Sequence, residues 1–214
     1  MKDYDITAAR GYLANGEIDE AMGLYERFQA EGKFDREAGV GLKLCKFWKT
    51  AETGNAGEIS LAAIDLATRV KVSKDLDFGF AAILAPMIMK ILKEKIGFWK
   101  RLAMDRKSMH ELAEAAREVI LAALLSEDIA RLPQDEQLKL CELAVQIDNF
   151  VIGTRSDAER RYGTIEKDER MSQVYEMLGR RDPRKFWNGT AMINKGAIAI
   201  CIIMMLVILF SRGC

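Results

Sequence analysis

The chain has 214 residues, half of them hydrophobic, and its 32 basic side chains are balanced by 32 acidic ones. This composition excludes a disordered tail, a collagen-like chain and a polycationic nucleic-acid-binding protein. One globular domain with a further segment fits it. Because phosphate neutralisation needs clustered Lys and Arg, we expect no nucleic-acid partner.

Apolar positions recur at helical spacing through the N-terminal part, and the alternation typical of strands is absent. The sequence therefore predicts an all-α chain. Its first four helices are predicted as two hairpins, at residues 5–14 with 18–30 and at residues 35–52 with 58–71. Gly16 is placed to turn the first hairpin, and Gly32 to cap the end of its second helix.

The first hairpin resembles the tetratricopeptide pattern, because Tyr12, Gly16, Ala21 and Tyr25 stand on its characteristic positions. The glycine turns the chain, the alanine lets two helices approach, and the tyrosines fill the seam. The resemblance extends through Gly32 to the related pentatricopeptide pattern.

The resemblance spans residues 8–32 and, faintly, residues 34–71, where Gly57-Glu58-Ile59 repeats Gly16-Glu17-Ile18. Phe28 and Lys33 depart from the pattern, which has a small residue and a proline there. A repeat-like stack of hairpins and a non-repetitive helical bundle both fit these residues. The resemblance implies a groove that binds a peptide or a helix, and it makes Tyr12, Tyr25, Phe47 and Trp48 the candidate partner-binding residues.

Residues 78–92 are apolar on every side except at Lys90, which is typical of a central, buried helix. Pro86 either kinks this helix or stands in the first turn of a new one. The following stretch to Arg101 is basic and aromatic, and its alternative interpretation is contact with anionic lipid. Two further amphipathic helices are predicted, at residues 108–125 and 133–151.

Residues 1–155 therefore form the predicted helical domain, and residues 156–190 a charged helical stalk with a basic segment next to the membrane. A transmembrane helix is predicted at residues 191–211, followed by a tail of residues 212–214. The strictly apolar run, residues 196–210, covers about 22 Å as a helix and could be a core helix, whereas 21 residues cover about 31 Å, which matches the hydrocarbon thickness of roughly 30 Å.

Basic residues are concentrated before the predicted span, and only Arg212 follows it, so we expect the domain to lie in the cytoplasm. No signal-peptide pattern stands at Met1. The predicted membrane-interface residues are Arg184, Lys185, Trp187 and Lys195. The chain would then be a single-pass, tail-anchored protein of a bacterial inner membrane or an organelle membrane.

No constellation typical of catalysis occurs in the sequence, and we expect neither an enzyme nor a bound cofactor or metal. His110 is the only histidine, which excludes a multi-histidine metal site. The glycines lack the lysine and hydroxyl residue that follow them in a phosphate-binding loop. The four cysteines have no paired spacing, in agreement with a reducing compartment.

Proteins and lipids remain as partners. We expect a tail-anchored adaptor or scaffold whose helical domain binds other proteins at the membrane, with self-association left open. One alternative is a structural single-span subunit of a membrane machine, similar in layout to helical components of bacterial secretion systems. Another is a tail-anchored regulator of organelle membranes, by analogy with mitochondrial fission adaptors and apoptosis regulators.

Overall fold

The computed structural model describes residues 6–73, 76–154 and 168–182, and every regular element in these ranges is a helix. The all-α prediction is therefore confirmed. The chain divides into two compact units, Met1–Gly163 and Thr164–Cys214, which are described separately.

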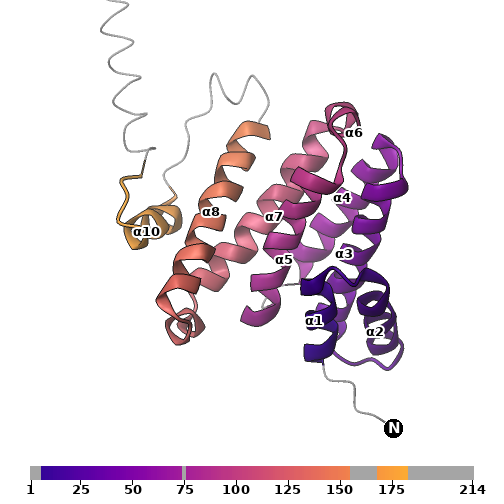
Figure 1. The fold of residues 1–214 in the computed structure, drawn as a ribbon, viewed down its shortest axis with the longest axis horizontal. Coiled ribbons are helices and arrows are strands. Elements are labelled where there is room, and N and C mark those ends of the chain that lie inside the picture. The colour runs from indigo at the N-terminus through magenta and orange to yellow at the C-terminus, as the bar shows by residue number, and fades with distance from the viewer. Residues whose placement is uncertain (1–5, 74–75, 155–167, 183–214) are drawn as a thin grey trace, which may run out of the picture. The chain divides into compact units, whose positions relative to one another are not determined.

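The helices of the first unit begin and end close to the predicted boundaries (Figure 1). They are α1 (Ile6–Asn15), α2 (Ile18–Ala30), α3 (Asp35–Thr53), α4 (Ala56–Val72), α5 (Phe78–Lys90), a π-helical turn (Ile91–Lys95), α6 (Phe98–Ala103), α7 (Arg106–Leu124), a 3₁₀ turn (Glu127–Arg131) and α8 (Gln134–Thr154). The sequence did not predict α6 or the two short turns.

Local chemistry explains where several helices begin and end. Gly16 and Gly32 have positive φ angles of 81° and 64°, the left-handed conformation that glycine adopts without strain. Asn55 and Glu58 form a reciprocal capping box at the start of α4. The carboxylate of Asp105 accepts hydrogen bonds from the first turn of α7.

Consecutive helices pack in a row, α1 on α2, α2 on α3 and α3 on α4, after which α4 packs on α7 and α7 on α8. Helix α5 stands outside this row and contacts α1, α3, α7 and α8 (Figure 1). It connects the N-terminal hairpins to the C-terminal pair. The two predicted hairpins therefore form, and a helix that belongs to neither of them covers one of their faces.

Helix α5 is central, as its apolar sequence predicted. Phe80, Leu84, Ala85 and Ile88 have no exposed surface. Pro86 lies inside the helix rather than in a first turn. The helix continues past it into the π turn, where the Ile96 amide donates to the Ile91 carbonyl at 3.1 Å.

The second unit contributes α10 (Glu169–Met177), which ends before Gly179 at a positive φ of 64°. Met171, Val174 and Tyr175 are buried, so α10 is an amphipathic helix. Among the described residues, no helix is both long and apolar enough to cross a bilayer. The predicted span at residues 191–211 lies outside those residues, as do Arg184, Lys185, Trp187 and Lys195.

Candidate functional site

Three of the four residues predicted to bind a partner lie in the core. Tyr25 and Phe47 have no exposed surface, and Trp48 is 5% exposed, whereas Tyr12 is 37% exposed. A groove lined by these aromatic rings is therefore not open at the surface, because the rings pack the helices together. Tyr12 alone is accessible to a partner.

Tyr25 marks the contact between the first hairpin and α5. Its ring lies edge-on to Phe80 of α5, with the centroids 6.4 Å apart, and it also lies against Gly41 of α3. Its hydroxyl has no hydrogen-bond partner among the described residues. Burial raises the pKa of this hydroxyl above its ordinary value, so the group stays neutral.

Trp48 fastens α3 to the π turn. The Nζ of Lys95 lies 4.5 Å from the Trp48 ring centroid, and the Nζ of Lys90 lies 5.5 Å from it. The indole Nε1 donates to Glu52 at 2.9 Å, and Lys95 donates to the same carboxylate oxygen at 3.0 Å. These contacts hold the π turn, which precedes α6 in the chain, against α3.

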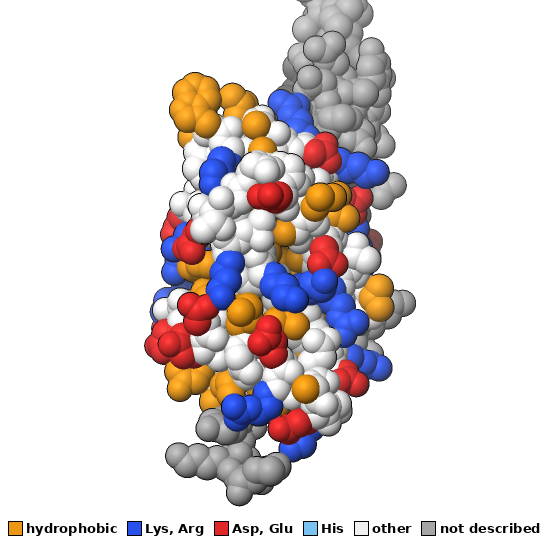
Figure 2. All heavy atoms as spheres, turned by 90° about the vertical axis from the view of Figure 1, so that its right-hand side faces the viewer, with side chains coloured by type: hydrophobic (Ala, Val, Ile, Leu, Met, Phe, Trp, Pro, Cys, Tyr) orange, Lys and Arg blue, Asp and Glu red, His pale blue; other side chains and the backbone are white. Residues whose placement is uncertain are grey.

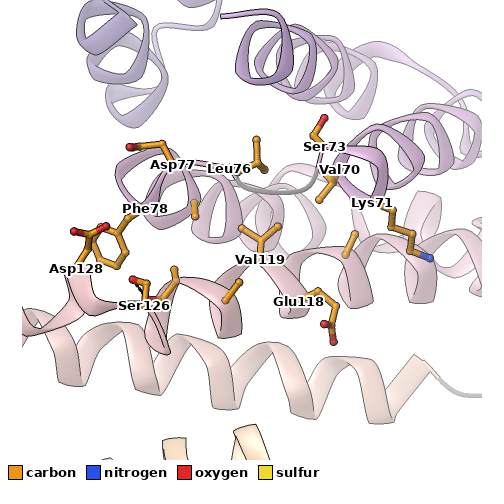
Figure 3. A pocket seen from close by; sticks show the side chains of 14 residues that line it. Val70, Lys71, Ser73, Leu76, Asp77, Phe78, Glu118, Val119, Ser126 and Asp128 are labelled. Atoms are coloured by element: carbon orange, nitrogen blue, oxygen red, sulfur yellow. Dashed lines mark hydrogen bonds between the residues drawn. The ribbon is translucent and has the colours of Figure 1, made fainter.

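The structure instead opens a pocket of about 620 Å³ between the end of α4, the start of α5 and the middle of α7. We call it the α4–α5–α7 pocket. Figure 3 shows its lining, with Val119 projecting from α7 between the residues of the two other helices. The lining residues are Val70, Lys71, Ser73, Leu76, Asp77, Phe78, Ala81, Ala115, Glu118, Val119, Ala122, Ala123, Ser126 and Asp128.

The lining of the α4–α5–α7 pocket is mostly apolar. Small side chains on one face of α7, among them Ala115, Ala122 and Ala123, leave space that a larger residue would fill. Leu76, Phe78 and Val119 are partly exposed beside them. By its volume and lining, the pocket suits a large apolar side chain.

Three carboxylates and one ammonium group stand among the lining residues. Asp77 pairs with Arg10 at 2.8 Å, and that arginine also binds Glu37 through two hydrogen bonds of 2.8 and 2.6 Å. Lys71, the ammonium, pairs with Glu111 of α7, which lowers the pKa of that carboxyl.

The second rim carboxylate, Glu118, is 3.4 Å from Arg117, whose guanidinium also donates to Asp148 at 2.7 Å. The third, Asp128, pairs with Arg131 at 2.8 Å. Two of these arginines are thus shared with a further carboxylate. Among these described contacts carboxylates outnumber cations, which favours a positively charged residue beside an apolar one.

The described residues do not gather three potential metal ligands of the His, Cys, Asp or Glu type at any point. His110 joins α7 to α8, since its Nδ1 is 3.1 Å from the hydroxyl of Thr154. Its Nε2 lies 4.0 Å from Glu114, one turn further along α7. His110 therefore holds α7 against α8.

The sequence predicts an amphipathic helix at residues 108–125 and gives no prediction of the pocket. The one local signal is the run of small residues on α7, which leaves a face without bulky side chains. That signal is ambiguous, because a partner helix of the same chain could equally cover the face. Only the position of α5 shows that part of it stays open.

Comparison with known proteins finds no matching family model, no matching curated protein and no matching solved structure.

Proposed function

We propose that the chain is a tail-anchored, non-catalytic adaptor that binds a protein partner in the α4–α5–α7 pocket. The observation that carries the proposal is the pocket itself, an apolar depression of about 620 Å³ with carboxylates at its rim. A partner segment with a large apolar side chain and an adjacent Lys or Arg suits both features. An amphipathic helix and an extended peptide can each present such a pair.

The anchor is supported by the sequence. Residues 196–210 carry no charged side chain, and the five basic residues closest before and within the span outnumber the single one after it. The five are Arg180, Arg181, Arg184, Lys185 and Lys195, and the single one is Arg212. Their distribution favours a domain that stays in the cytoplasm.

Site-specific photocrosslinking tests the adaptor. A photoreactive residue at Ala122, which is exposed and lines the pocket, should give a discrete product with one partner in the chain's native membranes. The matched control is the same group at Lys139, which is exposed on α8 outside the pocket. The Ala122 product should disappear when Val119→Asp places a charge in the pocket, with the helical circular dichroism unchanged.

Three results of this experiment contradict the adaptor. If Ala122 and Lys139 give the same products, the pocket has no selectivity. A product with twice the mass of the chain identifies a second copy as the occupant. Several large, stable products at both positions indicate a structural subunit embedded in a membrane machine, which is the alternative function.

Two measurements test the anchor independently of the pocket. Removal of every residue after Lys185 should release a folded, helical protein into the soluble fraction, because the apolar run is expected to contribute nothing to the core. Aggregation would identify residues 191–210 as a core helix. In intact cells or organelles, an impermeant thiol reagent should label Cys214, and labelling of Cys214 only after the membrane is permeabilised would reverse the orientation.

A further inference from the structure

Helix α6 presents three adjacent large apolar side chains to solvent. Phe98, Trp99 and Leu102 are 65%, 77% and 69% exposed, and no residue of this six-residue helix is buried. Phe98 and Trp99 pack edge to face with their centroids 5.2 Å apart. Isolated exposed apolar residues are ordinary, but three of them on one short helix form a patch that water solvates poorly. We call Phe98, Trp99 and Leu102 the α6 patch.

The α6 patch lies in the most basic part of the domain. Between Lys93 and Lys107 there are six basic and two acidic side chains, a net charge of +4 in a chain whose net charge is zero. One of the two acids, Asp105, accepts hydrogen bonds from the first turn of α7. The two acids are Glu94 and Asp105, and the basic residues are Lys93, Lys95, Lys100, Arg101, Arg106 and Lys107.

The base of the α6 patch is held rigidly. Lys95 pairs with Glu52 of α3 at 3.0 Å, and Lys100 donates to the backbone carbonyl of the same residue at 3.2 Å. On the other side of α6, the amide of Asp105 donates to the hydroxyl of Ser60 on α4 at 3.2 Å. Helix α6 lies at one end of the domain (Figure 1), and Figure 2 shows hydrophobic side chains projecting at that end.

Charge and side-chain type together point to one occupant. The cores of protein interfaces are depleted in lysine, whereas Trp, Phe and Leu beside Lys and Arg are typical of a helix that lies in the membrane interface. There the aromatic rings enter the boundary of headgroups and acyl chains, and the cations attract anionic lipid. We propose that the α6 patch inserts into the surface of an anionic membrane.

The proposal deepens the proposed function and rests in part on it, because a tail anchor would keep α6 at high effective concentration beside a bilayer. A short apolar patch on its own binds weakly and reversibly. Together with the anchor, it would fix which face of the domain meets the lipid and leave the α4–α5–α7 pocket for a protein partner.

Quenching of tryptophan by brominated lipids tests the proposal on the full chain. The protein is reconstituted into phosphatidylcholine vesicles with or without 30 mol% phosphatidylserine, with bromine on the acyl chains. The difference between the wild type and Trp99→Phe reports residue 99 alone, since Trp48 and Trp187 are common to both. We expect strong quenching from residue 99 with phosphatidylserine, and weaker quenching without it or at 1 M salt.

Charge variants and a moved tryptophan complete the design. Arg101→Gln with Lys107→Gln should weaken association of the patch about fivefold for each charge removed, and Lys95 and Lys100 stay unchanged because they bind Glu52. The matched control combines Trp99→Phe with Val72→Trp, which places the indole at the opposite end of α4 from Ser60, at a position that is 69% exposed. The fluorescence intensity that this control loses to brominated lipid should equal the intensity lost by Trp99→Phe alone.

The possible outcomes distinguish the lipid contact of the α6 patch from its alternatives. Absence of quenching from residue 99 in phosphatidylserine vesicles, or equal quenching from residue 72, overturns the lipid contact. Concentration-dependent shielding of Trp99 from acrylamide in lipid-free detergent indicates self-association through the patch and also overturns it. If alkaline carbonate extracts the chain from the membrane, the anchor is refuted. Quenching of Trp99 in vesicles that co-sediment with the chain would still support the lipid contact in that case.

Discussion

Gly41→Ala tests the close contact between α2 and α3 on which the first part of the fold depends. A Cβ at residue 41 would lie 2.5 Å from two ring carbons of Tyr25 and 2.7 Å from a third, whereas ordinary van der Waals contacts lie between 3.4 and 4 Å. The ring or the helix must therefore move by about 1 Å. Phe80 on α5 stands against the same ring, which restricts that movement.

The expected effect combines two opposing terms. Overpacking a close core contact costs about 1–3 kcal/mol, and replacement of a helical glycine by alanine returns about 0.5–1 kcal/mol. We therefore expect Gly41→Ala to lower the free energy of unfolding by about 1–2 kcal/mol. Gly23→Ala is the matched control, because it lies inside α2 with no atom within 4 Å of its added methyl group, and it should raise stability by about 0.5–1 kcal/mol.

Urea denaturation of the full chain in detergent micelles, followed by helical circular dichroism, measures both variants. With a slope of about 1–3 kcal/mol/M, a separation of about 1.5–3 kcal/mol moves the two midpoints apart by about 0.5–3 M. Equal stabilisation by the two substitutions would show that residues 25 and 41 do not touch. The packing of α2 on α3 would then be wrong.

Four further predictions follow from individual contacts. Tyr25→Phe should leave stability unchanged or raise it by about 1 kcal/mol in the same assay, because it removes a buried hydroxyl without a described partner, and a loss of that size would reveal a missed hydrogen bond. Arg10→Ala should lower stability by about 2–4 kcal/mol, since it leaves the carboxylate of Glu37 buried without its guanidinium, and double substitution with Glu37→Gln should recover part of the loss. Hydrogen bonds, first of all from the Ser108 hydroxyl, lower the pKa of Asp105. The stability that this carboxylate contributes is therefore fully present above the ordinary carboxyl pKa and is lost as pH falls through the lowered pKa. Below about pH 4, the urea midpoint of Asp105→Asn should fall less with pH than that of the wild type. Burial raises the pKa of Cys45 to about 12, so at pH 8 its reaction with a maleimide should be at least about tenfold slower in the folded protein than in urea, and equal rates would contradict its burial.

The positions of the helices could be read from the sequence because the signals that set them are local. Glycines at residues 16 and 32 act within a few residues of themselves, and a 3.6-residue apolar period identifies the helix between two such signals. An apolar helix without a polar face, such as α5, must be central in any compact arrangement. The sequence alone therefore determined the all-α class and the central place of α5.

The tertiary structure decided which segments cover each helix face. Tyr25 and Trp48 have the residue types of a binding groove, and they are buried because α5 and the π turn, far along the chain, lie over them. Gly39 and Gly41 look like weak points of α3 in the sequence, yet a Cβ there would collide with Arg69 and Tyr25. The α4–α5–α7 pocket and the exposed α6 patch arise in the same way, because a helical period identifies an apolar stripe, whereas only packing between distant segments decides whether that stripe is covered.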